Sequence, residues 1–183
     1  MITNGVVDSV ELMHMANTIL LTPDDAPDYV ALRREMLQDA PWAFLASEAQ
    51  DRGCDVEKVR VSLQRTDAAI VGIRDDGKLV ASAGVVREEA LKRRHIAMIW
   101  GVYVTPAARG RGCARAVVSR AIELARSWVG IASIHLGVNE NAPAAKRLYE
   151  SLGFREWGLE PDAVRIDGRS FAEYHMQLPM TGV

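Results

Sequence analysis

The residues best suited to chemistry in this 183-residue chain form a short arginine- and glycine-rich loop, residues 109–114. The loop reads Arg-Gly-Arg-Gly-Cys-Ala and joins an apolar strand to a helix with one apolar face. Gly110 and Gly112 allow the backbone to bend sharply and to approach a ligand closely. The first N–H groups of the helix have no partner within it and lie at the positive end of its dipole. Together with Arg109 and Arg111, these donors predict a site for a phosphate or pyrophosphate.

A second segment, residues 141–154, first suggests a simple structural role. Asn141 is suited to cap a helix, and Pro143 to occupy its first turn. Tyr149 lies on the apolar stripe of that helix, where a tyrosine is usually a core residue. Gly153 fits the left-handed position after the helix end. The glycine loop alone is also a weak signal, because it has neither the Gly-Lys-Ser/Thr of nucleotide sites nor the Gly-x-Gly-x-x-Gly of dinucleotide sites.

The two segments together are more specific than either alone. In the first, Arg109, Gly112 and Ala114 fill the pattern Arg/Gln-x-x-Gly-x-Gly/Ala after a strand that ends in Val-Tyr-Val-x-Pro. In the second, Asn-x-x-Ala is followed by Leu-Tyr-Glu-x-Leu-Gly-Phe, which ends at Phe154. Both occur in the expected order with one predicted strand between them. The chain therefore resembles the GCN5-related N-acetyltransferase superfamily over roughly residues 17–178.

This resemblance implies transfer of an acetyl group from acetyl-CoA to a primary amine by direct attack. The loop would bind the pyrophosphate, and the preceding strand would pair in part with the pantetheine amides. A backbone N–H of Tyr103 or Val104 would stabilise negative charge on the thioester oxygen. Tyr149 matches the general acid that protonates the departing thiolate. The residues expected at the acetyl-CoA site are Val102, Tyr103, Val104, Arg109, Gly110, Arg111, Gly112, Cys113, Ala114 and Asn141.

Two features depart from the family pattern. In many relatives the asparagine lies one residue nearer the tyrosine than Asn141, which lies eight residues before Tyr149, while Asn139 lies ten before it. Some relatives carry a glutamate on the fourth strand, and this strand has no carboxylate. His95 or His175 is a candidate base, because an unperturbed imidazole titrates near pH ~6.5. The alternative function is a non-catalytic acyl-CoA-binding sensor or regulatory protein.

Length and composition narrow the class of protein. With 183 residues, 49% hydrophobic and 25% charged, the chain fits one globular domain. No apolar run reaches the ~18 residues of a membrane helix, and no signal peptide is evident. Cys54 and Cys113 are too far apart for a redox or metal pair, and the four histidines are scattered. We therefore expect a cytoplasmic protein with no metal site, no nucleic-acid partner and no membrane partner.

Charge is distributed unevenly along the chain. Residues 1–57 hold 11 acidic and 3 basic residues, whereas the remainder holds 13 and 19. The acidic part either steers a cationic acceptor or simply solvates surface helices. In the superfamily the first two helices and their linker border the acceptor, so Trp42 and Phe44 would contact it there. The carboxylates expected at this mouth are Asp24, Asp25, Asp28, Glu35, Asp39, Glu48 and Asp51.

The elements that must position these residues follow the order βααβββαβαββ. This order predicts an α/β fold with a mixed sheet of about six to seven strands and helices on both faces. The strand at residues 95–104 is apolar on both faces and should be central, and Gly101 within it indicates a bulge or a close backbone approach. A final hairpin is expected around a long loop at residues 160–170. We expect an N-terminal extension at residues 1–16, an acetyltransferase domain at residues 17–180, and a homodimer.

Overall fold

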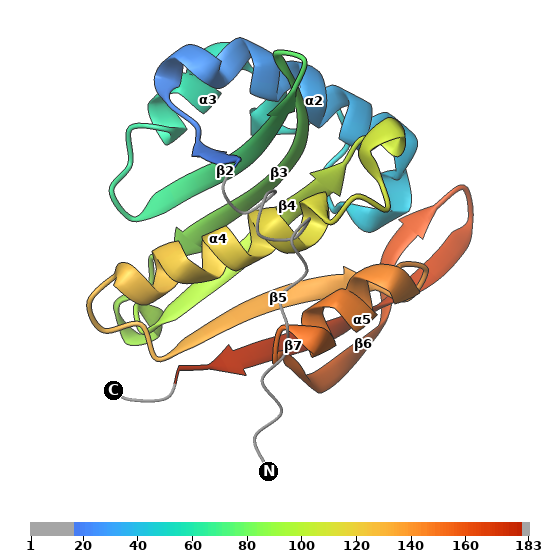
Figure 1. The fold of residues 1–183 in the computed structure, drawn as a ribbon. Coiled ribbons are helices and arrows are strands. Elements are labelled where there is room, and N and C mark those ends of the chain that lie inside the picture. Colours follow the sequence, from blue (N-terminus) through green and yellow to red (C-terminus); the bar gives the residue numbers. More distant parts are fainter. Residues whose placement is uncertain (1–16, 181–183) are drawn as a thin grey trace.

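The computed structural model describes residues 17–180, which form a seven-stranded sheet covered by helices (Figure 1). The strands are β1 (Thr18–Leu20), β2 (Ala68–Asp75), β3 (Lys78–Arg87), β4 (Ile96–Val104), β5 (Ser133–Asn139), β6 (Arg155–Ile166) and β7 (Arg169–Pro179). They lie in the order β1-β2-β3-β4-β5-β7-β6, and every neighbouring pair is antiparallel except β4 and β5. The predicted order of elements and the central position of β4 are confirmed. The expected extension, residues 1–16, lies outside the described residues.

Two pairs of helices cover opposite faces of the sheet, α2 (Ala26–Asp39) with α3 (Val56–Ser62), and α4 (Cys113–Ser127) with α5 (Pro143–Ser151). Side chains alternate along β2, so that Ile70 packs in the core beneath α2 while Val71 packs beneath α4. Helix α4 forms as predicted, because its buried residues recur every three or four positions. None of the helices within residues 17–180 has the length and apolar character needed to cross a membrane.

Strand β4 is bent at the predicted bulge. The register of β3 with β4 shifts between Ser82, which pairs with Tyr103, and Gly84, which pairs with Trp100. Gly101 lies within the shift and has a φ of 60°, a left-handed conformation that favours glycine. The bulge turns the second half of β4 relative to its first half, where the parallel partner β5 is still attached.

The last two strands differ from the prediction. Residues 160–170 are not a long loop, because β6 and β7 continue through them to a tight turn at Asp167 and Gly168. Both turn residues have positive φ, of 49° and 76°, as a two-residue hairpin turn requires. This segment contains Pro161, but β6 is an edge strand, and its register shifts between Glu160 and Val164. An edge with a bulge accommodates a proline without loss of the hairpin.

Candidate active site

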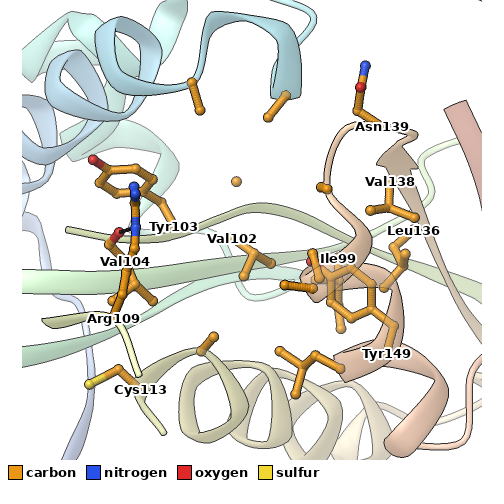
Figure 2. Close-up of a pocket in the computed structure, with 18 of the residues that line it drawn as sticks. Ile99, Val102, Tyr103, Val104, Arg109, Cys113, Leu136, Val138, Asn139 and Tyr149 are labelled. Carbon is orange, nitrogen blue, oxygen red and sulfur yellow. Dashed lines mark hydrogen bonds between the residues drawn. The ribbon is translucent and has the colours of Figure 1, made fainter. Parts of the chain in front are cut away.

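A cavity of about 480 Å³ lies where β4 and β5 diverge (Figure 2). Its walls come from the second half of β4, the end of β5, the N-terminus of α4, one side of α5, and the 3₁₀ turn η2 (Pro41–Ala43). Figure 2 shows Arg109 and Cys113 on one side of this cavity and Tyr149 on the other. Of the residues predicted from sequence, the cavity is lined by Val102, Tyr103, Val104, Arg109, Gly110, Gly112, Cys113, Ala114 and Tyr149.

The strand edges that face the cavity are open. In the described sheet, β4 and β5 pair only over residues 96–98 and 133–135, and the strands separate beyond these pairs. Residues 99–104 and 136–139 then line the cavity from its two sides. Backbone N–H and C=O groups at an open edge bind an extended ligand as they would bind another strand. The gap therefore suits an extended molecule that carries amides.

The loop before α4 has the backbone geometry of an anion site. Gly110 and Gly112 have φ values of 77° and 81°, in the left-handed region. Gly112 directly precedes the first residue of α4, and no side chain within residues 17–180 caps this helix. The first N–H groups of α4 are thus left for a ligand or for water. Gly110, Gly112, Cys113 and Ala114 all line the cavity, so the anion site opens into it.

The guanidinium of Arg109 is held by the protein. Its Nε donates to the backbone oxygen of Val104 at 3.1 Å, and its Nη2 donates to Asp39 at the end of α2. The group also lies over the ring of Tyr103, 5.8 Å from the ring centroid. These contacts tie the loop to β4 and to α2. Arg109 therefore holds the loop in place, and the backbone N–H groups of the loop are further donors for an anion.

Two residues expected at the cofactor site do not line the cavity. Arg111 pairs with Asp75 at 2.7 Å, and both side chains are about half exposed. Asn141 is exposed, and its backbone N–H donates to Oδ1 of Asn139 at 3.0 Å. Asn141 is not the helix cap either, since α5 begins after Ala142. Asn141 therefore lies in the turn between β5 and α5.

Asn139 is the asparagine that lines the cavity. It is 4% exposed, and its Nδ2 has no hydrogen-bond partner among the described residues. An unsatisfied buried donor of this kind costs about 1–3 kcal/mol. A ligand carbonyl in the cavity would satisfy it, which favours Asn139 over Asn141 as a ligand-binding residue.

Tyr149 reaches the cavity from α5. It is 5% exposed and packs edge-on against Phe154, with ring centroids 5.9 Å apart. Within residues 17–180 no group forms a hydrogen bond with its hydroxyl. Burial raises the pKa of this hydroxyl above its ordinary value, so the group stays protonated at neutral pH. Tyr149 thus keeps its proton at the cavity wall at neutral pH.

The wall toward α2 is aromatic. Trp42 and Phe44 line the cavity together with Trp100 of β4. The guanidinium of Arg33 lies 5.2 Å from the ring centroid of Phe44 and 6.0 Å from that of Trp100. Arg33 donates to Oδ2 of Asp51 from Nε at 2.9 Å, and the two side chains are only 9% and 8% exposed. This buried ion pair holds the guanidinium beside the rings of Phe44 and Trp100.

Most carboxylates expected at the acceptor mouth already have partners. Glu35 accepts a hydrogen bond from the Tyr103 hydroxyl at 3.2 Å. Ion pairs join Asp25 and Asp28 to Arg74, Asp39 to Arg109, Glu48 to Arg34, and Asp51 to Arg33. The field of this surface is therefore weaker than the number of acids in the sequence suggests.

Neither candidate histidine lines the cavity. His95 is exposed and precedes β4, at the end where β4 and β5 are still paired. His175 lies on β7, with its Nε2 3.0 Å from Oε2 of Glu160, and its ring stacks on Trp157. In the described part of the chain, no group of three or more His, Cys, Asp or Glu is placed to hold a metal ion.

Apart from Asn139, the sequence did not identify the β5 wall, formed by residues 136–139, or the place of Trp100. Alternation along a strand predicts which residues share a face but not where two strands separate. The one available signal was Gly101, whose bulge sets the direction of β4 beside the cavity.

Known proteins are similar to this chain in sequence and in fold. The model of the acetyltransferase (GNAT) family matches residues 30–154. The N-alpha-acetyltransferase RimI of Mycobacterium tuberculosis is 33% identical over 98 residues, which are 54% of this chain and 59% of that protein. The match thus spans less than two thirds of this relative's length.

Two solved structures have the same fold. A GNAT acetyltransferase from Streptococcus pneumoniae is 19% identical, with a TM-score of 0.80 over 89% of this chain and 98% of that one. The phosphinothricin acetyltransferase of Sinorhizobium meliloti, in complex with acetyl-CoA, is 20% identical, with a TM-score of 0.76 over 89% of this chain and 87% of that one. The family model covers well over half of the sequence. The chain therefore belongs to the acetyltransferase (GNAT) family, as its two motifs predicted.

Proposed function

We propose that this protein transfers the acetyl group of acetyl-CoA to a primary amine by direct attack of the amine on the thioester. The observation that carries the proposal is the separation of β4 from β5, which leaves two open strand edges on a cavity that leads to the N-terminus of α4. A molecule with a pyrophosphate at one end and a chain of amides fits such a site. Acetyl-CoA has both, and the S. meliloti relative is a complex with it.

In this proposal the pyrophosphate binds the backbone N–H groups of residues 110–114, and the pantetheine amides pair with residues 102–104. The buried Nδ2 of Asn139 donates to a carbonyl of the same ligand. A backbone N–H of Tyr103 or Val104 stabilises the charge on the thioester oxygen.

Tyr149 acts as the general acid. As the C–N bond forms and the C–S bond breaks, its hydroxyl protonates the thiolate of CoA. The hydroxyl suits this role because it lines the cavity, has no described partner and is kept protonated by burial.

The acceptor approaches from the side of Trp42, Phe44 and Trp100. The names of the relatives indicate two classes to test first, the N-terminal α-amine of a peptide and the amino group of phosphinothricin. We also propose that residues 17–180 form the whole acetyltransferase domain. A homodimer and a cytoplasmic location remain predictions.

The test is release of CoA from acetyl-CoA in the presence of a panel of amines, with acetylated product confirmed by mass. The panel holds an alanine-initiated peptide, phosphinothricin, a polyamine, a lysine peptide and an aminoglycoside. Turnover of one class above the rate of thioester hydrolysis is the expected result. Tight binding of acetyl-CoA without transfer to any amine would instead support the acyl-CoA sensor.

A further inference from the structure

A carboxylate on β7 lies beside the opening between β4 and β5. Glu173 pairs across the sheet with Asn139 of β5, and directly opposed residues share a face of the sheet. The carboxylate of Glu173 occupies the space that a side chain at position 137 would fill, since a β-carbon on Gly137 would lie 2.2 Å from its Oε1. Gly137 itself lines the cavity. Glu173 is not itself a lining residue, but its carboxylate covers Gly137 at the point where β5 borders the cavity.

The charged neighbours of Glu173 leave it without a partner. Within residues 17–180 its carboxylate forms no hydrogen bond or ion pair. The charged groups that act on its carboxyl are His175 on the same strand and Glu160 on β6, and Nε2 of His175 lies 3.0 Å from Oε2 of Glu160. Burial raises the pKa of the Glu173 carboxyl, His175 opposes this rise, and Glu160 adds to it. A half-buried, unpartnered carboxylate costs stability, as groups that bind cations or move protons often do.

The two faces of the gap carry different chemistry. Leu136 and Val138 of β5 belong to the core beneath α4 and α5, which also holds Tyr149. Gly137, with the Glu173 carboxylate over it, alternates with them and faces the other way. A thioester between β4 and β5 thus has a proton donor on one face and an unpartnered carboxylate on the other.

We propose that Glu173 binds the ammonium group of the acceptor and accepts its proton, on the face of the sheet opposite Tyr149. This inference rests on the proposed function and names the base that the sequence did not supply. It also makes the acceptor a cationic amine, whose charge is matched by the carboxylate and whose carbon chain lies along the aromatic wall of Trp42 and Trp100.

The proton balance of the step is complete with these two residues. The ammonium gives one proton to Glu173, which later passes it to water, and the neutral nitrogen attacks the thioester carbonyl. The C–N bond forms, the C–S bond breaks, and the thiolate takes the proton of Tyr149. The second proton lost from nitrogen restores the Tyr149 hydroxyl. The products are the acetylated amine, CoA as its thiol, and one proton released to solvent.

The test compares Glu173→Gln with the wild type, using the amine from the panel that gives the fastest turnover. Loss of a general base typically lowers kcat/KM for the acceptor about 10²- to 10⁴-fold. The deficit should shrink as pH rises toward the pKa of the amine, because free amine then needs no base. A merely structural role would lower activity equally at every pH. Glu173→Asp should recover part of the activity, since it keeps the carboxylate.

Glu160→Gln is the matched control, because it removes a carboxylate from the same hairpin that bonds to His175 and not to the cavity wall. It should keep wild-type kinetics, and all three variants should keep the thermal shift that acetyl-CoA gives. Equal kcat/KM for Glu173→Gln and wild type, or a deficit that does not change with pH, would overturn this inference alone. Absence of turnover by the wild type with every amine would overturn the proposed function and the inference with it.

Discussion

Replacing Tyr149 by phenylalanine removes one oxygen atom from the proposed transfer site and leaves its packing in place. The hydroxyl has no hydrogen-bond partner within residues 17–180, so none of the ~0.5–1.5 kcal/mol that such a bond contributes is lost. The edge contact with Phe154 needs only the ring. The free energy of unfolding should therefore change by less than about 0.5 kcal/mol, and acetyl-CoA should bind as in the wild type.

The rate of acetyl transfer should change far more than stability. A positioned general acid contributes about 10²- to 10⁴-fold. At ~1.36 kcal/mol for each factor of ten, this raises the barrier by about 2.7–5.4 kcal/mol. Burial raises the pKa of the Tyr149 hydroxyl, so the wild type keeps its acid throughout the neutral and mildly alkaline range. Its kcat should show no alkaline loss below the ordinary tyrosine pKa of about 10.

The assay follows CoA release with a thiol reagent at saturating acetyl-CoA and amine, with rapid-quench measurements to establish that chemistry limits kcat. Tyr174→Phe is the matched control, because Tyr174 packs against the same core but does not line the cavity. It should keep the wild-type kcat. If Tyr149→Phe also keeps it while chemistry is the slow step, the general-acid assignment is wrong and Tyr149 only packs.

Three further results are expected. Gly112→Val should abolish the increase in thermal stability that acetyl-CoA gives, because a β-branched residue at a φ of 81° costs at least ~1–2 kcal/mol and keeps the phosphate away from the backbone. An unchanged increase would refute the anion site. Asp51→Ala should lower the free energy of unfolding in chemical denaturation by about 3–5 kcal/mol, because it leaves Arg33 buried without its partner. Asp75→Ala, which breaks a surface ion pair, should cost less than ~1 kcal/mol, and equal effects would refute the distinction between the buried and the exposed pair. The folded state raises the pKa of Glu173, so ionising this carboxyl costs folding free energy only above the unfolded pKa of about 4.5, and the full cost is reached above the folded pKa. Glu173→Gln should therefore gain stability relative to the wild type as pH rises through that window. A difference in unfolding free energy that stays constant with pH would contradict the burial argument.

The proposed acetyl-CoA half of the site could be predicted from the sequence because the residues that form it are consecutive in the chain. A strand, a glycine turn and a helix start follow one another over residues 102–114, so local backbone preference alone decides where the N–H groups point. The structure places all but Arg111 of the residues named there on one cavity. Arg111 turns to Asp75 instead, a partner 36 residues away that no local rule identifies.

The acceptor half could not be predicted in the same way, because it depends on long-range register. The sequence pattern distinguishes Glu173 in no way from its neighbours in the expected final hairpin, and its place beside the cavity wall follows only from its pairing with Asn139. The same register separates Asn139 from Asn141, since only the first still belongs to β5. A shift of one residue in either strand would turn Glu173 to the other face, so the sequence pattern alone leaves its role open.

The separation of β4 from β5 connects these two halves. If β4 and β5 stayed paired along their whole length, their backbone groups would hydrogen-bond to each other and leave no open edge to bind the amides of a ligand. An acceptor amine on one face of the sheet would then also have no path to a thioester bound on the other face. After residue 98 the strands part, and the bulge at Gly101 turns β4 away. The proposed acid, Tyr149, and the proposed base, Glu173, lie toward opposite faces of the sheet, and both would then reach one thioester. The strand separation that opens the proposed acetyl-CoA site is thus also what would allow an acid and a base to act from two sides.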